Sequence, residues 1–68
     1  MEPQVSVREE RGFCVIDVRT PAASLLVRGE TRADALHRLR RQVKFVTRSD
    51  KQMRETLMRL CQQAERTH

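Results

Sequence analysis

Aromatic residues are almost missing from this chain of 68 residues, which has no tryptophan, no tyrosine and only two phenylalanines, Phe13 and Phe45. Modules that bind single-stranded RNA usually stack the bases on aromatic rings. Only Phe13 stands where a sheet could present such a ring, so this mode of RNA binding is not favoured. The core must be built from valine, leucine, isoleucine and methionine.

Glycine and cysteine are equally scarce, with two residues of each. Gly12 and Gly29 each stand where a turn is expected, and they form no glycine-rich loop that could cradle a phosphate. Cys14 and Cys61 form neither a CxxC pair nor a dense disulfide framework. Each has apolar neighbours, which favours two buried thiols in a reducing compartment over a disulfide or a redox role.

Long apolar runs are also lacking. No segment approaches the roughly 20 apolar residues that cross a membrane, and no apolar run after Met1 indicates a signal peptide. We therefore expect a cytoplasmic protein without membrane contact, folded as one domain over residues 1–68. So short a chain buries only about 60% of its unfolded surface. A homodimer or a bound protein would be a natural way to enlarge its core.

What the chain does have is positive charge, with a formal net charge of +5. An excess of basic over acidic residues favours contact with nucleic acid, with an anionic surface or with an acidic protein. Arginine carries most of this charge, since Lys44 and Lys51 are the only lysines. A GC-rich coding sequence would produce the same bias, so a merely solvated basic surface remains an alternative.

The first half of the chain predicts three strands. Val5 and Val7 alternate with polar residues, a further strand covers residues 13–18, and a third covers residues 24–28 before Gly29. Between the first two, Gly12 supplies the positive φ that a short hairpin loop with a bulge requires. Residues 19–23 connect the second strand to the third. The spacing predicts an antiparallel meander.

The second strand carries apolar residues on both faces, which marks it as central or as facing a partner. One face would present Cys14, Ile16 and Val18. The other would present Phe13, Val15 and Asp17. Whichever set lies away from the helices, we expect it to offer a surface for a dimer or for another protein, and the set Phe13, Val15 and Asp17 is our candidate partner-binding face.

The second half predicts two helices. Thr31 stands three residues before Asp34, like a capping box, and an apolar stripe then spans about 100° of the first helix. This stripe contains Ala35, Leu36, Leu39, Val43 and Val46. Ser49 and Asp50 are candidate caps for the second helix, and Ser49 with Gln52 fits a capping box. The apolar stripe of that helix contains Met53, Leu57, Leu60, Cys61 and Ala64.

These elements predict an α+β fold of order β-β-β-α-α, in which two helices pack on one face of a three-stranded antiparallel sheet. The side of the first helix opposite its apolar stripe carries a basic row of His37, Arg40, Arg41 and Lys44, which Arg48 would extend if the helix continued. Such a row could follow a phosphate backbone or meet an acidic partner. Phe45 lies off the stripe, and it either caps the edge of the core or is an exposed contact.

The chemistry-bearing residues do not predict an enzyme. Asp17 is the only carboxylate in the middle of a strand, and an outward position is favoured for it. His37 and His68 have no ligand at helical spacing, so we expect neither a metal nor a cofactor. Cys14 and His37 could in principle form a nucleophile pair, but nothing near them in the sequence supports this. We expect no catalytic residues.

Several of these residues also carry a resemblance. Gly12-Phe13 opening a strand, followed by Gly29-Glu30-Thr31, Ala35-Leu36 and Leu39, resembles the N-terminal domain of HicB-like antitoxins over Gly12 to Val43. The resemblance implies a partial ribonuclease-H-like or double-stranded-RNA-binding-like fold that lacks catalysis, oligomerises, and binds and masks a small toxic RNase. The chain departs from the family where Pro21-Ala22-Ala23-Ser24 replaces a Pro-Gly turn. It also leaves no room for a final strand or a DNA-binding domain, so we do not expect repressor activity.

The expected function is thus a small non-catalytic interaction module that binds and regulates another protein, in the manner of an antitoxin. The alternative is a small basic protein that binds nucleic acid through the basic row. A stand-alone bacterial or prophage regulator with the same topology fits the first expectation equally well.

Overall fold

The computed structural model describes residues 2–21 and 23–66, so Met1, Ala22 and the last two residues, His68 among them, lie outside the description. The elements follow the predicted order. They are β1 (Gln4–Glu10), β2 (Phe13–Arg19), β3 (Ser24–Gly29), α1 (Arg32–Val46) and α2 (Lys51–Arg66). The predicted β-β-β-α-α arrangement is confirmed.

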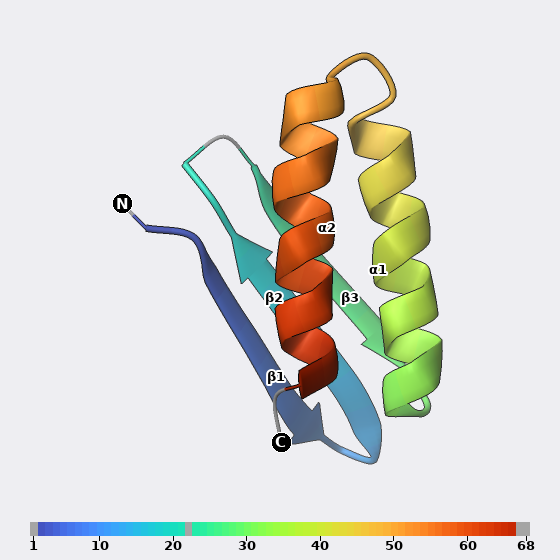
Figure 1. The fold of residues 1–68 in the computed structure, drawn as a ribbon. Helices are drawn as coiled ribbons and strands as arrows, with labels where there is room; N and C mark the ends of the chain where they lie inside the picture. The colour runs from blue at the N-terminus through green and yellow to red at the C-terminus, as the bar shows by residue number, and fades with distance from the viewer. Residues whose placement is uncertain (1, 22, 67–68) are drawn as a thin grey trace.

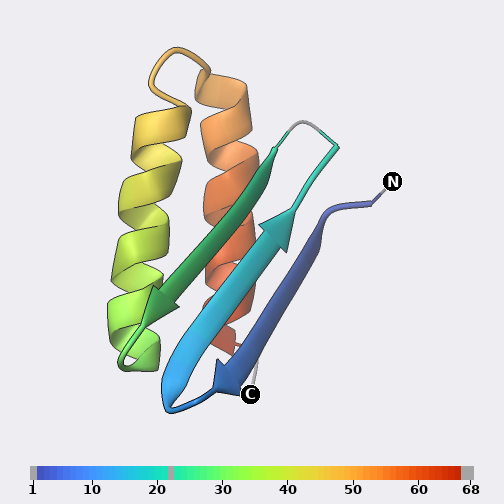
Figure 2. The same ribbon diagram turned by 180° about the vertical axis from the view of Figure 1, so that it is seen from behind.

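The sheet is antiparallel with the strand order β1-β2-β3, which confirms β2 as the central strand. Ile16 pairs with Val7 on one side and with Val27 on the other. Both helices lie on one face of this sheet, with α1 beside β3 (Figures 1 and 2). Within the described residues, the opposite face carries no helix. β1 and β3 are consequently the two edges of the sheet.

The turn between β1 and β2 is tighter than the sequence indicated. Glu10 pairs directly with Phe13, so only Arg11 and Gly12 form the loop. Both residues have positive φ, 52° at Arg11 and 83° at Gly12. Two successive residues with positive φ are typical of a two-residue type I′ hairpin, whose twist matches that of the strands. The expected bulge is therefore wrong, although the predicted positive φ of Gly12 is confirmed.

The start of α1 is capped as predicted. The hydroxyl of Thr31 accepts a hydrogen bond of 3.0 Å from the backbone N–H of Asp34. The carboxylate of Asp34 accepts one of 3.2 Å from the backbone N–H of Glu30. Together these bonds satisfy donors at the helix entrance that would otherwise lack partners.

The apolar stripe of α1 is confirmed at Ala35, Leu36, Leu39 and Val43, which are all buried. Its last predicted member is wrong, because Val46 is 42% exposed. Thr47 is fully buried instead, and its hydroxyl donates to the carbonyl of Val43. Thr47 is buried in place of Val46 because α1 ends at Val46 and α2 packs on the Thr47 side of that end.

The second helix begins one residue later than the Ser49 capping box required. The carboxylate of Asp50 accepts a hydrogen bond of 3.0 Å from the N–H of Met53, so Asp50 is the cap and Ser49 is not. Its predicted stripe is confirmed. Leu57, Leu60, Cys61 and Ala64 are buried, and Met53 is partly buried against the core.

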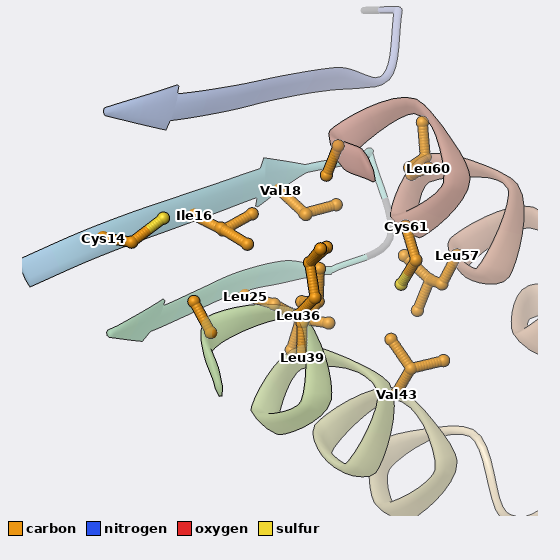
Figure 3. Close-up of a cluster of buried hydrophobic side chains, with 12 residues drawn as sticks. Cys14, Ile16, Val18, Leu25, Leu36, Leu39, Val43, Leu57, Leu60 and Cys61 are labelled. Atoms are coloured by element: carbon orange, nitrogen blue, oxygen red, sulfur yellow. The ribbon is translucent and has the colours of Figure 1, made fainter. Parts of the chain in front are cut away.

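The core lies between the sheet and the helix pair, where side chains from β2, β3, α1 and α2 meet (Figure 3). Cys14, Ile16 and Val18 point into it, and Ile16 and Leu39 are completely buried. Cys14 and Cys61 are both buried free thiols, as expected. Neither helix in the described residues has the length and apolar character needed to cross a membrane.

Candidate functional site

The open face of the sheet carries the row predicted as a partner-binding surface. Because Cys14, Ile16 and Val18 join the core, Phe13, Val15 and Asp17 face away from the helices. Val15 is nevertheless only 4% exposed. Its direct cross-strand neighbours are Arg8 and Arg28, and long arginine side chains can cover apolar neighbours with their aliphatic stems.

The charged groups of this open face are largely paired with one another. Arg19 and Asp17 form an ion pair of 3.2 Å, and Arg8 and Glu10 form one of 3.0 Å. The guanidinium carbon of Arg28 lies 4.8 Å from the centre of the Phe13 ring, a cation–π contact. A partner on this face would therefore meet arginine side chains before it met Val15 or Asp17.

The structure divides the predicted basic row. His37, Arg41 and Lys44 are exposed on α1, whereas Arg40 is partly buried and forms an ion pair with Glu65 of α2. Arg48 lies in the connection after the helix has ended. The expectation that Arg40 shares the outer side with the others is corrected, because α2 packs along its flank of α1.

The chemistry-bearing residues lie in separate regions. Asp17 is on the open face, Cys14 is in the core, and His37 is exposed on α1, so Cys14 and His37 are not brought together as a nucleophile pair. Burial raises the pKa of the Cys61 thiol, and the positive charge of Arg40 opposes this rise. In the described residues, histidine, cysteine and carboxylate side chains form no cluster of three that could hold a metal ion.

A groove between the free edge of β3 and the side of α1 was not predicted. It has a volume of about 500 Å³. The residues that line it are Leu26, Val27, Arg28, Arg38, Arg41, Gln42 and Phe45. In Figure 2, α1 lies on the side of the free edge of β3. We call this hollow the β3–α1 groove.

Two large apolar side chains are exposed in the β3–α1 groove. Leu26 of β3 is 66% exposed and Phe45 of α1 is 71% exposed. The structure thus decides between the two alternatives for Phe45, which is an exposed contact and not a cap on the core. The off-stripe position of Phe45 was the one signal of this site in the sequence.

The β3–α1 groove is also positively charged. Arg28, Arg38 and Arg41 line it, and within the described part of the chain no carboxylate does. Arg38 forms an ion pair of 3.3 Å with Asp34, one turn earlier on α1, and its side chain stays 61% exposed. Apolar anchors among arginines form a chemically distinct surface on this small domain.

Comparison with known proteins does not identify a family or a relative for this chain. No protein family, no curated protein and no solved structure matches the chain.

Proposed function

We propose that the chain is a non-catalytic interaction module that binds another protein and thereby regulates it. One observation carries the proposal: Leu26 and Phe45, both largely exposed, line the same groove. Large apolar side chains gathered at one place on a small domain are typical of a binding surface. The flanking arginines fit this, since aromatic residues and arginine are enriched where proteins bind each other.

The HicB-like resemblance adds a partner class to this proposal, namely a small toxic ribonuclease that the domain would bind and mask. The residues that carry the resemblance lie where β3 ends at Gly29 and Thr31 caps α1. The open sheet face with Phe13, Val15 and Asp17 stays a predicted contact surface that adjoins the β3–α1 groove through Leu26 and Arg28.

The test is a pull-down with the tagged full chain from host lysate, with and without nuclease, read by mass spectrometry. We expect a stoichiometric protein that survives nuclease treatment. The double variant Leu26→Ser with Phe45→Ser should lose this protein, while its thermal unfolding midpoint stays close to that of the wild type. Val46→Ser is the matched control, since Val46 is exposed on the same helix but lies outside the groove lining.

Recovery of nucleic acid alone would contradict the proposal and favour the basic face of α1. In that case Arg41→Glu with Lys44→Glu should abolish recovery, and affinity for duplex DNA should fall by about 0.9 log units per neutralised phosphate for each decade of salt. A protein held by Leu26 and Phe45 should be much less sensitive to salt.

A further inference from the structure

The free edge of β3 presents unpaired backbone groups to the β3–α1 groove. Thr20 and Ala23, at the turn between β2 and β3, are joined by a backbone hydrogen bond of 2.8 Å. Hydrogen-bonded and non-hydrogen-bonded pairs alternate along an antiparallel ladder. Leu25 and Val27 therefore bond to β2, and the N–H and C=O groups of Leu26 and Arg28 point away from it.

The two edges of the sheet differ in how they are protected. β1 ends with Arg8, Glu9 and Glu10, and charged side chains of this kind discourage the addition of another strand. The middle of β3 is the apolar run Leu25-Leu26-Val27. Beside it, α1 supplies a wall from Arg38 to Phe45 along which an added strand could lie. Strand addition is favoured at β3 only.

Charge indicates what would occupy this edge. The added segment would lie among Arg28, Arg38 and Arg41, with Phe45 and Leu26 as its apolar contacts. An extended segment that carries acidic and apolar residues on each of its two faces places carboxylates against the arginines and apolar side chains against the anchors, since Leu26 and Arg28 share one face of β3. A second copy of this chain fits less well, because pairing β3 with β3 would bring two sets of these arginines together.

We propose that the β3–α1 groove binds an extended acidic segment of a partner protein, which adds to β3 as a fourth strand. The main chain of the segment would bond to the outward N–H and C=O groups of Leu26 and Arg28. This inference rests on the proposed protein-binding function and adds to it the chemistry and the geometry of the bound segment.

The experiment is a selection of phage-displayed random peptides of about eight residues, within the usual range of strand lengths, on the immobilised full chain. We expect the enriched peptides to combine acidic with apolar residues, with both kinds at positions two apart, because Leu26 and Arg28 share one face of β3. When a synthesised peptide binds, amide hydrogen exchange followed by NMR should slow at Leu26 and Arg28, because their N–H groups become bonded.

The decisive variant is Leu26→Pro, which removes the outward N–H and leaves the bonds between β2 and β3 in place. It should weaken binding about tenfold, the effect of one lost backbone hydrogen bond. Leu26→Ala keeps the N–H and removes more apolar surface, so it separates the backbone contribution from the side-chain contribution. Arg38→Glu with Arg41→Glu should abolish binding. Lys44→Glu with Lys51→Glu makes the same change in net charge outside the groove and should not.

Failure to enrich acidic peptides, or binding unaffected by Leu26→Pro and by the arginine reversals, would overturn the inference. Self-association of the chain that Leu26→Pro abolishes would also overturn it, in favour of a second copy. If the protein captured from lysate needs Leu26 and Phe45 but tolerates Leu26→Pro, strand addition is wrong while the proposed function stands. If no protein is captured, the proposed function itself fails.

Discussion

A Cβ placed on Gly29 would lie 2.5 Å from the backbone nitrogen of Ala35 and 2.9 Å from its Cα. The end of β3 and the first turn of α1 are therefore in direct backbone contact, which only glycine permits. Because these two elements are the walls of the β3–α1 groove, this contact holds the groove in shape.

Gly29→Ala should destabilise the fold by about 2–3 kcal/mol, because neither backbone can move away without disturbing the core. Urea unfolding followed by circular dichroism measures the loss. Gly12→Ala is the matched control, since a Cβ there meets nothing within 4 Å. It should cost only about 1 kcal/mol, from the left-handed backbone alone. Equal losses in the two variants would contradict the backbone contact.

The backbone of Arg11 has a φ of 52°, a value that residues other than glycine and asparagine rarely adopt. Arg11→Asn should therefore stabilise the hairpin by about 0.5–1 kcal/mol, since Asn-Gly is the preferred pair for this turn. Thermal unfolding should show a higher midpoint. Arg11→Ala removes the same charge but keeps the strain, so a similar gain in that variant would point to charge as the cause.

Arg54 caps the end of the first helix from the first turn of the second. Its Nη2 donates to the carbonyl oxygens of Thr47 at 3.0 Å and Arg48 at 3.3 Å. Arg54→Met keeps much of the apolar stem but removes both of these bonds, although the carbonyl of Thr47 still accepts from the N–H of Asp50, and should cost about 1 kcal/mol. Arg59→Met, at an exposed position of the same helix, should change the free energy of unfolding little.

The buried thiol of Cys61 predicts a loss of stability at high pH. Burial raises its pKa above 9.0, against the opposing charge of Arg40, so the folded state holds the proton more tightly than the unfolded chain does. This contribution is complete below pH 9.0 and is lost as the pH rises through the folded-state pKa. Urea unfolding across this range should show the decline, and Cys61→Ala should flatten it. An unchanged slope in Cys61→Ala would assign the decline to other groups.

Most of the fold could be predicted from the sequence, because the spacing of apolar residues along a strand or a helix indicates which of its sides is buried. The alternation in β1 and the spacing from Ala35 to Val43 each depend on one element meeting one layer. Errors arose where an element ends. Thr47 is buried where Val46 was expected to be, and Asp50 caps α2 in place of Ser49. Such details depend on how α2 turns back over α1.

The site was harder to predict, because its residues are distant in the sequence. Leu26 and Phe45 come together only when α1 lies beside the outer edge of β3, and no local pattern specifies which edge that will be. Arg40 illustrates the same limit. Its helical position predicted an exposed cation, yet Glu65 of α2 pairs with it.

The unequal edges of the sheet also bear on the stoichiometry of assembly. A sheet that accepts strands at both margins can grow without limit, as fibrils do. Here Arg8, Glu9 and Glu10 discourage growth at β1, and the proposed addition at β3 would place one segment beside α1. Each copy of the domain would take up a single segment and then stop, which yields a closed complex with a fixed ratio of components.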